Sequence, residues 1–297
     1  MKIIDMLLKD QFTLSFEVFP PVREGNFDSL YSTIEELIKI NPHFISVTYG
    51  AGGSTRDKTV EIASRIKNEF RQEVLAHLTC VQATAEDTAK ILDTFKAENI
   101  ENVLALRGDP PKEEKAFLKP EGGFGHANEL VEFIKMKDNF SIGVAGYPEG
   151  HIEAPNLDAD ITNLKRKVDA GADFIITQLF FNNDDFYRFR DLSIAKGIRV
   201  PIIPAIFPIF NYKQISKIAS LCGAKLPSKL HDKLCKVSDK SEEVEKYGIE
   251  YATSQSEKLL NNNIPGLHFY SMNRSRHVIQ IIRELHLPIQ KPAPISE

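Results

Sequence analysis

The feature that most constrains the fold is a regular alternation between short β-rich segments and longer amphipathic helical segments along the whole chain. Because strands that alternate with helices pair in parallel, this order predicts an α/β fold. Eight such units without a change of composition predict a single-domain (β/α)8 TIM barrel over residues 1–297. Strands are expected at 13–19, 44–50, 73–80, 102–109, 141–148, 173–181, 201–209 and 266–272.

The helical segments carry recognisable start and stop signals. Ser54–Asp57 and Thr84–Asp87 both place an acid three residues after a hydroxyl, which is typical of a capping box. Gly171 and Gly197 each end a helical segment just before the next strand. A doubly wound sheet is the competing arrangement, but it favours a glycine-rich first turn, and the first strand here ends in FEVFPP.

Two segments interrupt the alternation. Residues 110–126 form a long loop after the fourth strand, where a TIM barrel carries its active-site loops. Residues 227–263 are charged and helical in pattern, and we interpret them as an inserted helical pair before the eighth strand.

Composition narrows the possible partners. A net charge of −4 gives no reason to expect a nucleic acid or an anionic membrane, and no apolar run approaches the length of a membrane span. The three cysteines, Cys80, Cys222 and Cys235, are too scattered for disulfides or a metal site. We expect a soluble cytoplasmic protein without a bound metal, and a homo-oligomer.

Polar side chains recur on one face of the predicted strands. Successive strand residues point to opposite sides, so Ser15 and Glu17 face the barrel interior while Leu14 and Phe16 face the helices. In the fourth strand the same reasoning places Arg107 and Asp109 inward and its leucines outward. The full inward set is Thr13, Ser15, Glu17, Ser46, Thr48, His77, Thr79, Arg107, Asp109, Ser141, Gly143, Ala145, Tyr147, His268 and Tyr270, and the sixth strand adds Thr177 and Gln178.

Each of these residues alone has an ordinary structural explanation. His77 could be a hydrogen-bonded core histidine, and Glu17 could simply pair with Arg107. However, barrel interiors are normally filled by branched aliphatic side chains, and buried charges cost several kcal/mol, on the order of 3–5, unless they are paired or used. The convergence of polar residues at the strand ends therefore predicts a functional site there.

The fifth strand and the helix after it indicate a flat, anionic ligand. Gly143, Ala145 and Gly146 leave space at the barrel mouth. The spacing of Asp160, Asn163 and Lys167 puts an acid, an amide and a cation on one helix face, which suits ribose hydroxyls and a diphosphate. A solvated charged face is the alternative. No P-loop or GxGxxG motif is present, so a nucleotide would bind without a Rossmann fingerprint.

Taken together, several motifs resemble the methylenetetrahydrofolate reductase family, in its bacterial form with a catalytic domain only. The resemblance covers about residues 13–285 and rests on FEVFPP, SVTYGAGGSTRDKT, HLTC, ALRGDPP, AGYPEGH, NLKRKVDAGADFIITQLFF, IIPAIFP and HFYSMNR. It implies reduction of 5,10-methylenetetrahydrofolate to 5-methyltetrahydrofolate, a step of one-carbon metabolism and methionine biosynthesis, without control by S-adenosylmethionine.

The resemblance also implies a non-covalently bound FAD, reduced by NADH or NADPH in a ping-pong reaction. Glu17 resembles the general acid that opens the folate ring, and Asp109 resembles the carboxylate near the flavin and the pterin. Gln178, Gln214 and Arg274 resemble folate contacts, and Thr48 and Gln178 resemble nicotinamide contacts. The implied flavin site comprises Tyr49, Ala51, His77, Arg107, Gly108, Asp109, Ala127, Tyr147, His151, Ala154, Asp160, Asn163, Arg166 and Lys167.

At one position the chain departs from the family pattern. Some members carry a phenylalanine in the helix after the seventh strand that stacks on either substrate, and Ile218 stands at the matching position here. Phe210 and Tyr212 are alternative stacking residues. Three other functions remain open: another FAD-dependent barrel oxidoreductase similar to proline dehydrogenase, a folate or pterin transferase without flavin, and a non-catalytic barrel.

Overall fold

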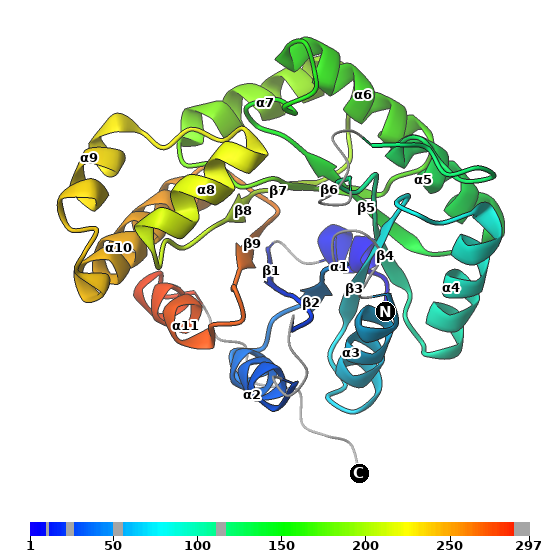
Figure 1. Cartoon of the computed structure of the whole chain (residues 1–297), viewed down its shortest axis with the longest axis horizontal. Coiled ribbons are helices and arrows are strands. Elements are labelled where there is room, and N and C mark those ends of the chain that lie inside the picture. The colour runs from blue at the N-terminus through cyan, green and yellow to red at the C-terminus, as the bar shows by residue number, and fades with distance from the viewer. Residues whose placement is uncertain (10–11, 22–26, 50–55, 111–116, 288–297) are drawn as a thin grey trace.

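The computed structural model describes residues 1–9, 12–21, 27–49, 56–110 and 117–287. It shows a barrel of parallel strands surrounded by helices (Figure 1). All strand pairs are parallel, in the order β7-β6-β5-β4-β3-β2-β1-β9-β8. This arrangement confirms the predicted TIM barrel. The strands are β1 (Thr13–Val18), β2 (Phe44–Val47), β3 (Val74–Thr79), β4 (Asn102–Leu106), β5 (Ser141–Gly146), β6 (Phe174–Thr177), β7 (Ile202–Ile203), β8 (Ala205–Ile206) and β9 (Gly266–Tyr270).

The predicted seventh strand is divided into β7 and β8 by Pro204. Proline has no N–H, so it cannot donate to a neighbouring strand. β7 pairs with β6, whereas β8 pairs with β9, and the Pro204 carbonyl accepts from the His268 amide at 3.1 Å. The two short strands therefore close the barrel as successive parts of one barrel strand.

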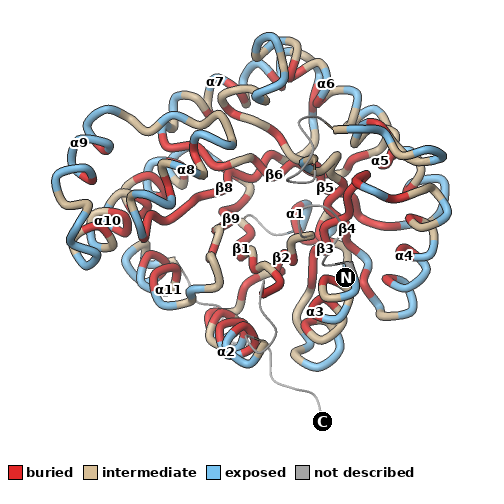
Figure 2. Tube along the Cα trace, in the orientation of Figure 1, coloured by how far each residue is buried: buried red, intermediate tan, exposed pale blue. Residues whose placement is uncertain are grey.

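One helix closes the amino-terminal end of the barrel, and the others surround it. Ile3 and Leu7 of α1 (Ile3–Lys9) pack into the barrel interior, and the Ile3 amide donates to Asn102 Oδ1 at 2.7 Å. Figure 2 shows buried inner faces and exposed outer faces on the surrounding helices. These are α2 (Phe27–Ile38), α3 (Arg56–Asn68), α4 (Ala85–Ala97), α5 (Ala127–Lys137), α6 (Leu157–Asp169), α7 (Asn183–Ala195), α8 (Tyr212–Cys222), α9 (Ser228–Lys236), α10 (Ser241–Leu260) and α11 (Ser275–Glu284).

Three of the four predicted helix boundaries lie within the described residues. Thr84 Oγ1 accepts from the Asp87 amide at 3.1 Å, and an Asp87 carboxylate oxygen accepts from the Thr84 amide at 3.1 Å. This reciprocal pair confirms the second capping box. Gly171 and Gly197 have φ values of 115° and 88°, which confirms both helix stops. Ser54 lies outside the described residues.

The barrel separates two apolar cores. Leu14, Phe16 and Val18 pack against the helices, whereas Phe44 and Phe174 fill the barrel interior. The predicted faces of the first strand are therefore confirmed. The predicted faces of the fourth strand are wrong, because Leu104 belongs to the interior core and Leu106 packs against it.

Residues 227–263 contain α9 and α10. α10 packs against α7 and α11 and so covers the barrel between them, whereas α9 lies farther out (Figure 1). No helix in the described part of the chain is long and apolar enough to cross a membrane.

Candidate active site

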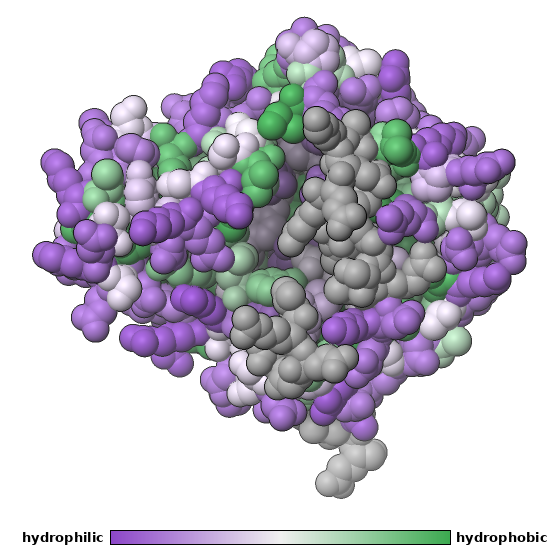
Figure 3. Space-filling model, in the orientation of Figure 1, coloured by the Kyte–Doolittle hydropathy of each residue, from purple (hydrophilic) through white to green (hydrophobic). Residues whose placement is uncertain are grey.

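A cavity of about 530 Å³ opens at the carboxyl ends of the strands, and a hollow is visible at the centre of the face shown in Figure 3. This size is within the range of small-molecule and cofactor sites. The cavity brings together most of the predicted site residues, which come from the carboxyl ends of the six strands β1 to β6 and from the helices α5 and α6. Those that line it are Glu17, Thr48, His77, Arg107, Gly108, Asp109, Ala127, Tyr147, His151, Ala154, Asp160, Asn163, Arg166, Lys167 and Gln178.

Three predicted residues do not line this cavity. Tyr49 follows β2, Gln214 is exposed in the first turn of α8, and Arg274 is exposed after β9 with its guanidinium 5.6 Å from the Phe210 ring. Ala51 lies outside the described residues. The cavity therefore does not include Gln214 and Arg274, two of the three predicted folate contacts.

Glu17 lies at the cavity floor beside two imidazoles. Its Oε2 is 3.4 Å from His77 Nε2 and 3.7 Å from His268 Nε2. Each imidazole contacts a serine: Ser46 Oγ is 2.7 Å from His77 Nε2, and Ser15 Oγ is 2.8 Å from His268 Nδ1. The first strand thus presents a carboxyl group whose position is restricted by side chains from β3 and β9.

His77 is buried in this cluster, and burial lowers its pKa to about 4, although the nearby Glu17 opposes the shift. A histidine with a lowered pKa stays neutral at physiological pH. His77 is therefore a neutral hydrogen-bonding group beside Glu17 rather than a cation.

This shift predicts a pH-dependent stability. An unfolded histidine binds its proton near pH 6.5, whereas folded His77 binds one only near pH 4, so the unfolded state holds more protons between these values. The free energy of unfolding should consequently fall as pH drops from 6.5 to 4, by about 3 kcal/mol for this group. In urea titrations, His77→Asn should reduce the stability difference between pH 7 and pH 4.5 by about 2 kcal/mol. An unchanged difference would show that His77 keeps an ordinary histidine pKa in the folded state.

Arg107 pairs with Glu153, not with Glu17. Its Nη1 and Nη2 contact the two Glu153 carboxylate oxygens at 2.5 and 2.8 Å, and the Phe117 ring lies 5.1 Å from its guanidinium. The hydrogen bonds to Glu153 raise the Arg107 pKa, and Arg107 in turn lowers the pKa of Glu153. The ion pair joins the loops after β4 and β5 across the cavity wall.

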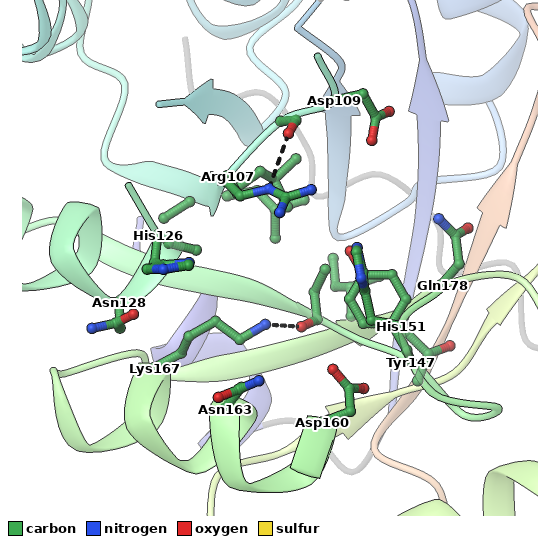
Figure 4. A pocket seen from close by; sticks show the side chains of 18 of the residues that line it. Arg107, Asp109, His126, Asn128, Tyr147, His151, Asp160, Asn163, Lys167 and Gln178 are labelled. Carbon is green, nitrogen blue, oxygen red and sulfur yellow. Dashed lines mark hydrogen bonds between the residues drawn. The ribbon is translucent and has the colours of Figure 1, made fainter. Parts of the chain in front are cut away.

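The wall formed by β5 and α6 carries a buried acid, Asp160, and a partly buried amine, Lys167 (Figure 4). Lys167 Nζ donates to the Ala145 carbonyl at 2.5 Å, and burial lowers the Lys167 pKa to about 8 against the opposing charge of Asp160. Burial also raises the pKa of Asp160, whose Oδ2 has no hydrogen-bond partner among the described residues. The Tyr147 and His151 rings meet edge to face with centroids 4.7 Å apart, and Lys167 Nζ lies 5.9 Å from the centroid of the Tyr147 ring.

Gln178 offers its amide donors to the cavity. Its Oε1 accepts from the Leu179 amide at 2.8 Å, which identifies that atom as the oxygen because a backbone N–H can only donate. The Tyr270 hydroxyl donates to the Thr177 carbonyl at 3.0 Å and lies 3.5 Å from the same Oε1. No described residue accepts from Gln178 Nε2, so this group is available to a ligand carbonyl.

Gly108 fixes the path of the chain after β4. Its φ of +85° is in the left-handed region, and a Cβ there would lie 2.6 Å from a Val81 methyl group. The turn lets Arg107 and Asp109 both line the cavity although the strand has already ended at Leu106.

Several residues that line the cavity were not predicted from the sequence. His126 precedes α5 and Asn128 lies in its first turn, Glu153 and Pro155 follow β5, and Tyr270 was predicted to face inward but not to belong to the site. Glu153 lies two residues after the end of the motif AGYPEGH, so a slightly longer motif would have included it. Ile218, Phe210 and Tyr212 do not line the cavity; Phe210 packs against His277 at 4.4 Å between ring centroids.

Within the described part of the chain, no group of three or more His, Cys, Asp or Glu side chains is placed so that it could hold a metal ion. The site therefore offers proton donors, amide donors and buried charges. This set can bind a polar, partly anionic cofactor on one wall and a reacting substrate beside Glu17.

Comparison with known proteins identifies relatives over nearly the whole chain. The family model described as methylenetetrahydrofolate reductase matches residues 2–286. "Methylenetetrahydrofolate reductase (NADH) 1" of Arabidopsis thaliana is 42% identical over 97% of this chain and 51% of its own length. "5,10-Methylenetetrahydrofolate reductase" of Escherichia coli is 38% identical over 90% of this chain and 88% of its own length. The chain thus spans about half the length of the plant relative.

A solved structure supports the fold alone. A protein from Clostridium thermocellum, described as binding two copies of 5-methyl-5,6,7,8-tetrahydrofolic acid, superposes with a TM-score of 0.63 at 15% sequence identity. The match covers 95% of this chain and 96% of that one.

Proposed function

Because the chain belongs to the methylenetetrahydrofolate reductase family, we propose that it reduces 5,10-methylenetetrahydrofolate to 5-methyltetrahydrofolate with FAD as its cofactor. The observation that carries this proposal is the composition of one cavity. Glu17 and Gln178 lie in the same cavity as Asp160 and Lys167. A proton donor and amide donors for a substrate thus share a space with charged groups for a nucleotide.

The residues of the α6 wall fit FAD. Asp160 Oδ2 is a buried oxygen without a hydrogen-bond partner among the described residues, and it could accept from a ribose hydroxyl. Lys167 and Arg166 could bind the diphosphate through charge-assisted hydrogen bonds. The space predicted at Gly143 is instead filled by the Phe174 ring, from which a Cβ there would lie only 2.6 Å, so Gly143 does not enlarge the cavity. When bound, the flavin would supply the hydride for the reduction.

Residues near Glu17 would perform the acid chemistry on the folate. Opening the five-membered ring requires a proton on the departing nitrogen, and the Glu17 carboxyl group can donate it. The ring opening leaves a cationic iminium on the substrate, and the Asp109 carboxylate can stabilise that charge. Gln178 Nε2 can donate to the pterin carbonyl and so orient the substrate.

We infer NADH as the electron donor, since the names of the plant relatives specify it. The Gln178 amide that suits a pterin carbonyl also suits the carboxamide of nicotinamide. One cavity would then serve both substrates in turn, which predicts ping-pong kinetics.

An absorbance spectrum followed by two anaerobic additions tests this function. The purified or FAD-supplemented protein should show flavin bands, lose them on adding NADH, and regain them on adding methylenetetrahydrofolate. A protein that takes up no flavin contradicts the FAD assignment. Reoxidation by pyrroline carboxylate, or reduction by proline instead of NADH, would favour a function similar to proline dehydrogenase.

Replacing Asp109 should slow only the folate step. Asp109→Asn removes the charge that faces the cationic substrate, so reoxidation by methylenetetrahydrofolate should slow by about 10- to 100-fold, or about 1–3 kcal/mol in the barrier. Stopped-flow absorbance measures this rate. Asp158→Asn is the matched control, because Asp158 pairs with Lys196 on the outer surface of α6. A wild-type rate in Asp109→Asn would remove Asp109 from the chemistry.

A further inference from the structure

A second histidine lies behind Glu17 and takes no part in the steps described above. The side chain of His268 is fully buried, and it does not line the cavity. Its Nε2 makes no hydrogen bond with any described residue, and its nearest charged neighbour is Glu17 Oε2 at 3.7 Å. Because a buried polar atom without a partner is destabilising, this arrangement requires an explanation.

The His268 ring is held on three sides. Ser15 lies opposite His268 in the pairing of β1 with β9, and the two side chains meet at 2.8 Å between Oγ and Nδ1. Phe44 stacks on the ring with centroids 6.2 Å apart, and Tyr270 meets it edge to face at 5.7 Å. The ring therefore has little freedom to turn, and its Nε2 stays directed toward Glu17.

The two imidazoles beside Glu17 are not equivalent. His77 Nε2, the atom nearer to Glu17, also contacts Ser46 Oγ at 2.7 Å. His268 uses its other nitrogen for Ser15, so its Nε2 remains uncommitted. Both imidazoles approach the same carboxyl oxygen, Oε2, which leaves Oε1 for a substrate.

We propose that Ser15 and His268 are positioning residues for the general acid Glu17. The Ser15 hydroxyl donates to Nδ1 and thereby places the ring proton on Nε2. Nε2–H then donates to Oε2 once a small rotation of the carboxyl group shortens the present 3.7 Å. The other oxygen, Oε1, is left to carry the proton that goes to the substrate. This role rests on the proposed function, because it concerns the proton donated during ring opening.

Stopped-flow measurement of both half-reactions tests the proposal. His268→Leu removes the donor at similar size, so reoxidation by methylenetetrahydrofolate should slow by about 10- to 100-fold, as expected for a lost hydrogen bond to a charged group. Reduction by NADH should change less than about twofold, because it requires no proton from Glu17. His268→Gln, which can still present an N–H, should recover most of the rate. A structural role would slow both half-reactions, and Gln would not restore one selectively.

Three further measurements keep the test decisive. His43→Leu is the matched control, since His43 contacts the Leu14 amide at the opposite end of the first strand. Should His268→Leu fail to fold, Ser15→Ala should show a smaller loss confined to the folate step. In the flavin-free protein, ¹⁵N NMR should find the His268 proton on Nε2, and a proton on Nδ1 would overturn the proposal. A wild-type enzyme that does not reduce methylenetetrahydrofolate overturns the proposed function as well, whereas equal folate rates in wild type and His268→Leu overturn only the role of His268.

Discussion

Glu17→Gln should leave reduction of the enzyme by NADH nearly normal while slowing its reoxidation by methylenetetrahydrofolate by at least 100-fold. Loss of a positioned general acid commonly costs about 10²–10⁴ in rate. Hydride transfer from NADH needs no proton donor for ring opening, so the two half-reactions separate. The amide keeps the shape of the carboxyl group, and a glutamine can still contact His77 and His268. Anaerobic stopped-flow spectroscopy of each half-reaction measures both rates.

A control at the other end of the barrel distinguishes chemistry from stability. Glu73→Gln makes the same change at the residue before β3, where Glu73 contacts Lys67 at 2.7 Å and the amino terminus at 2.8 Å. It should leave both half-reactions unchanged. If Glu17→Gln slows both steps equally, Glu17 is a structural member of the histidine cluster. If it slows neither, another group donates the proton.

Much of the barrel could be predicted because side chains alternate between the two faces along each strand and because many helices carry their own boundary signals. The first strand shows this clearly, since Leu14, Phe16 and Val18 all pack outward as the alternation requires. The alternation fails where the chain leaves the sheet. Leu106 ends β4, and the left-handed Gly108 then turns the chain, so the residue parity of the strand no longer predicts which way Arg107 and Asp109 point.

Contacts between separate loops were harder to predict. The sequence pattern placed Glu17 and Arg107 on one rim and allowed them to pair. In the structure Arg107 pairs with Glu153 from the next loop, and Glu17 lies between His77 and His268. Spacing along a chain predicts neighbours within one helix or strand, whereas these pairs depend on how the barrel closes. The His268 contact in particular requires the register of β1 with β9.

The helix face on α6 was predicted from spacing alone, and it leads to the second large effect. Lys167→Met should weaken FAD binding by about 10- to 100-fold, because it removes a charge-assisted hydrogen bond worth about 1.5–3 kcal/mol. Since burial lowers the Lys167 pKa to about 8, an anionic ligand must also hold the amine in its protonated form. FAD affinity of the wild type should therefore fall as pH rises above 8, by up to about tenfold per pH unit.

Flavin fluorescence titrations of the flavin-free protein between pH 7 and pH 9.5 measure both effects. Lys167→Met should have a weaker affinity that no longer changes at pH 8, because the titrating amine is gone. Lys165→Met is the matched control, since Lys165 lies on the same helix but pairs with Asp169 and does not line the cavity. It should bind FAD like the wild type and keep the pH dependence. If Lys167→Met loses affinity but keeps the fall above pH 8, another group causes the titration. If its affinity is unchanged, the diphosphate is bound by other residues of the cavity.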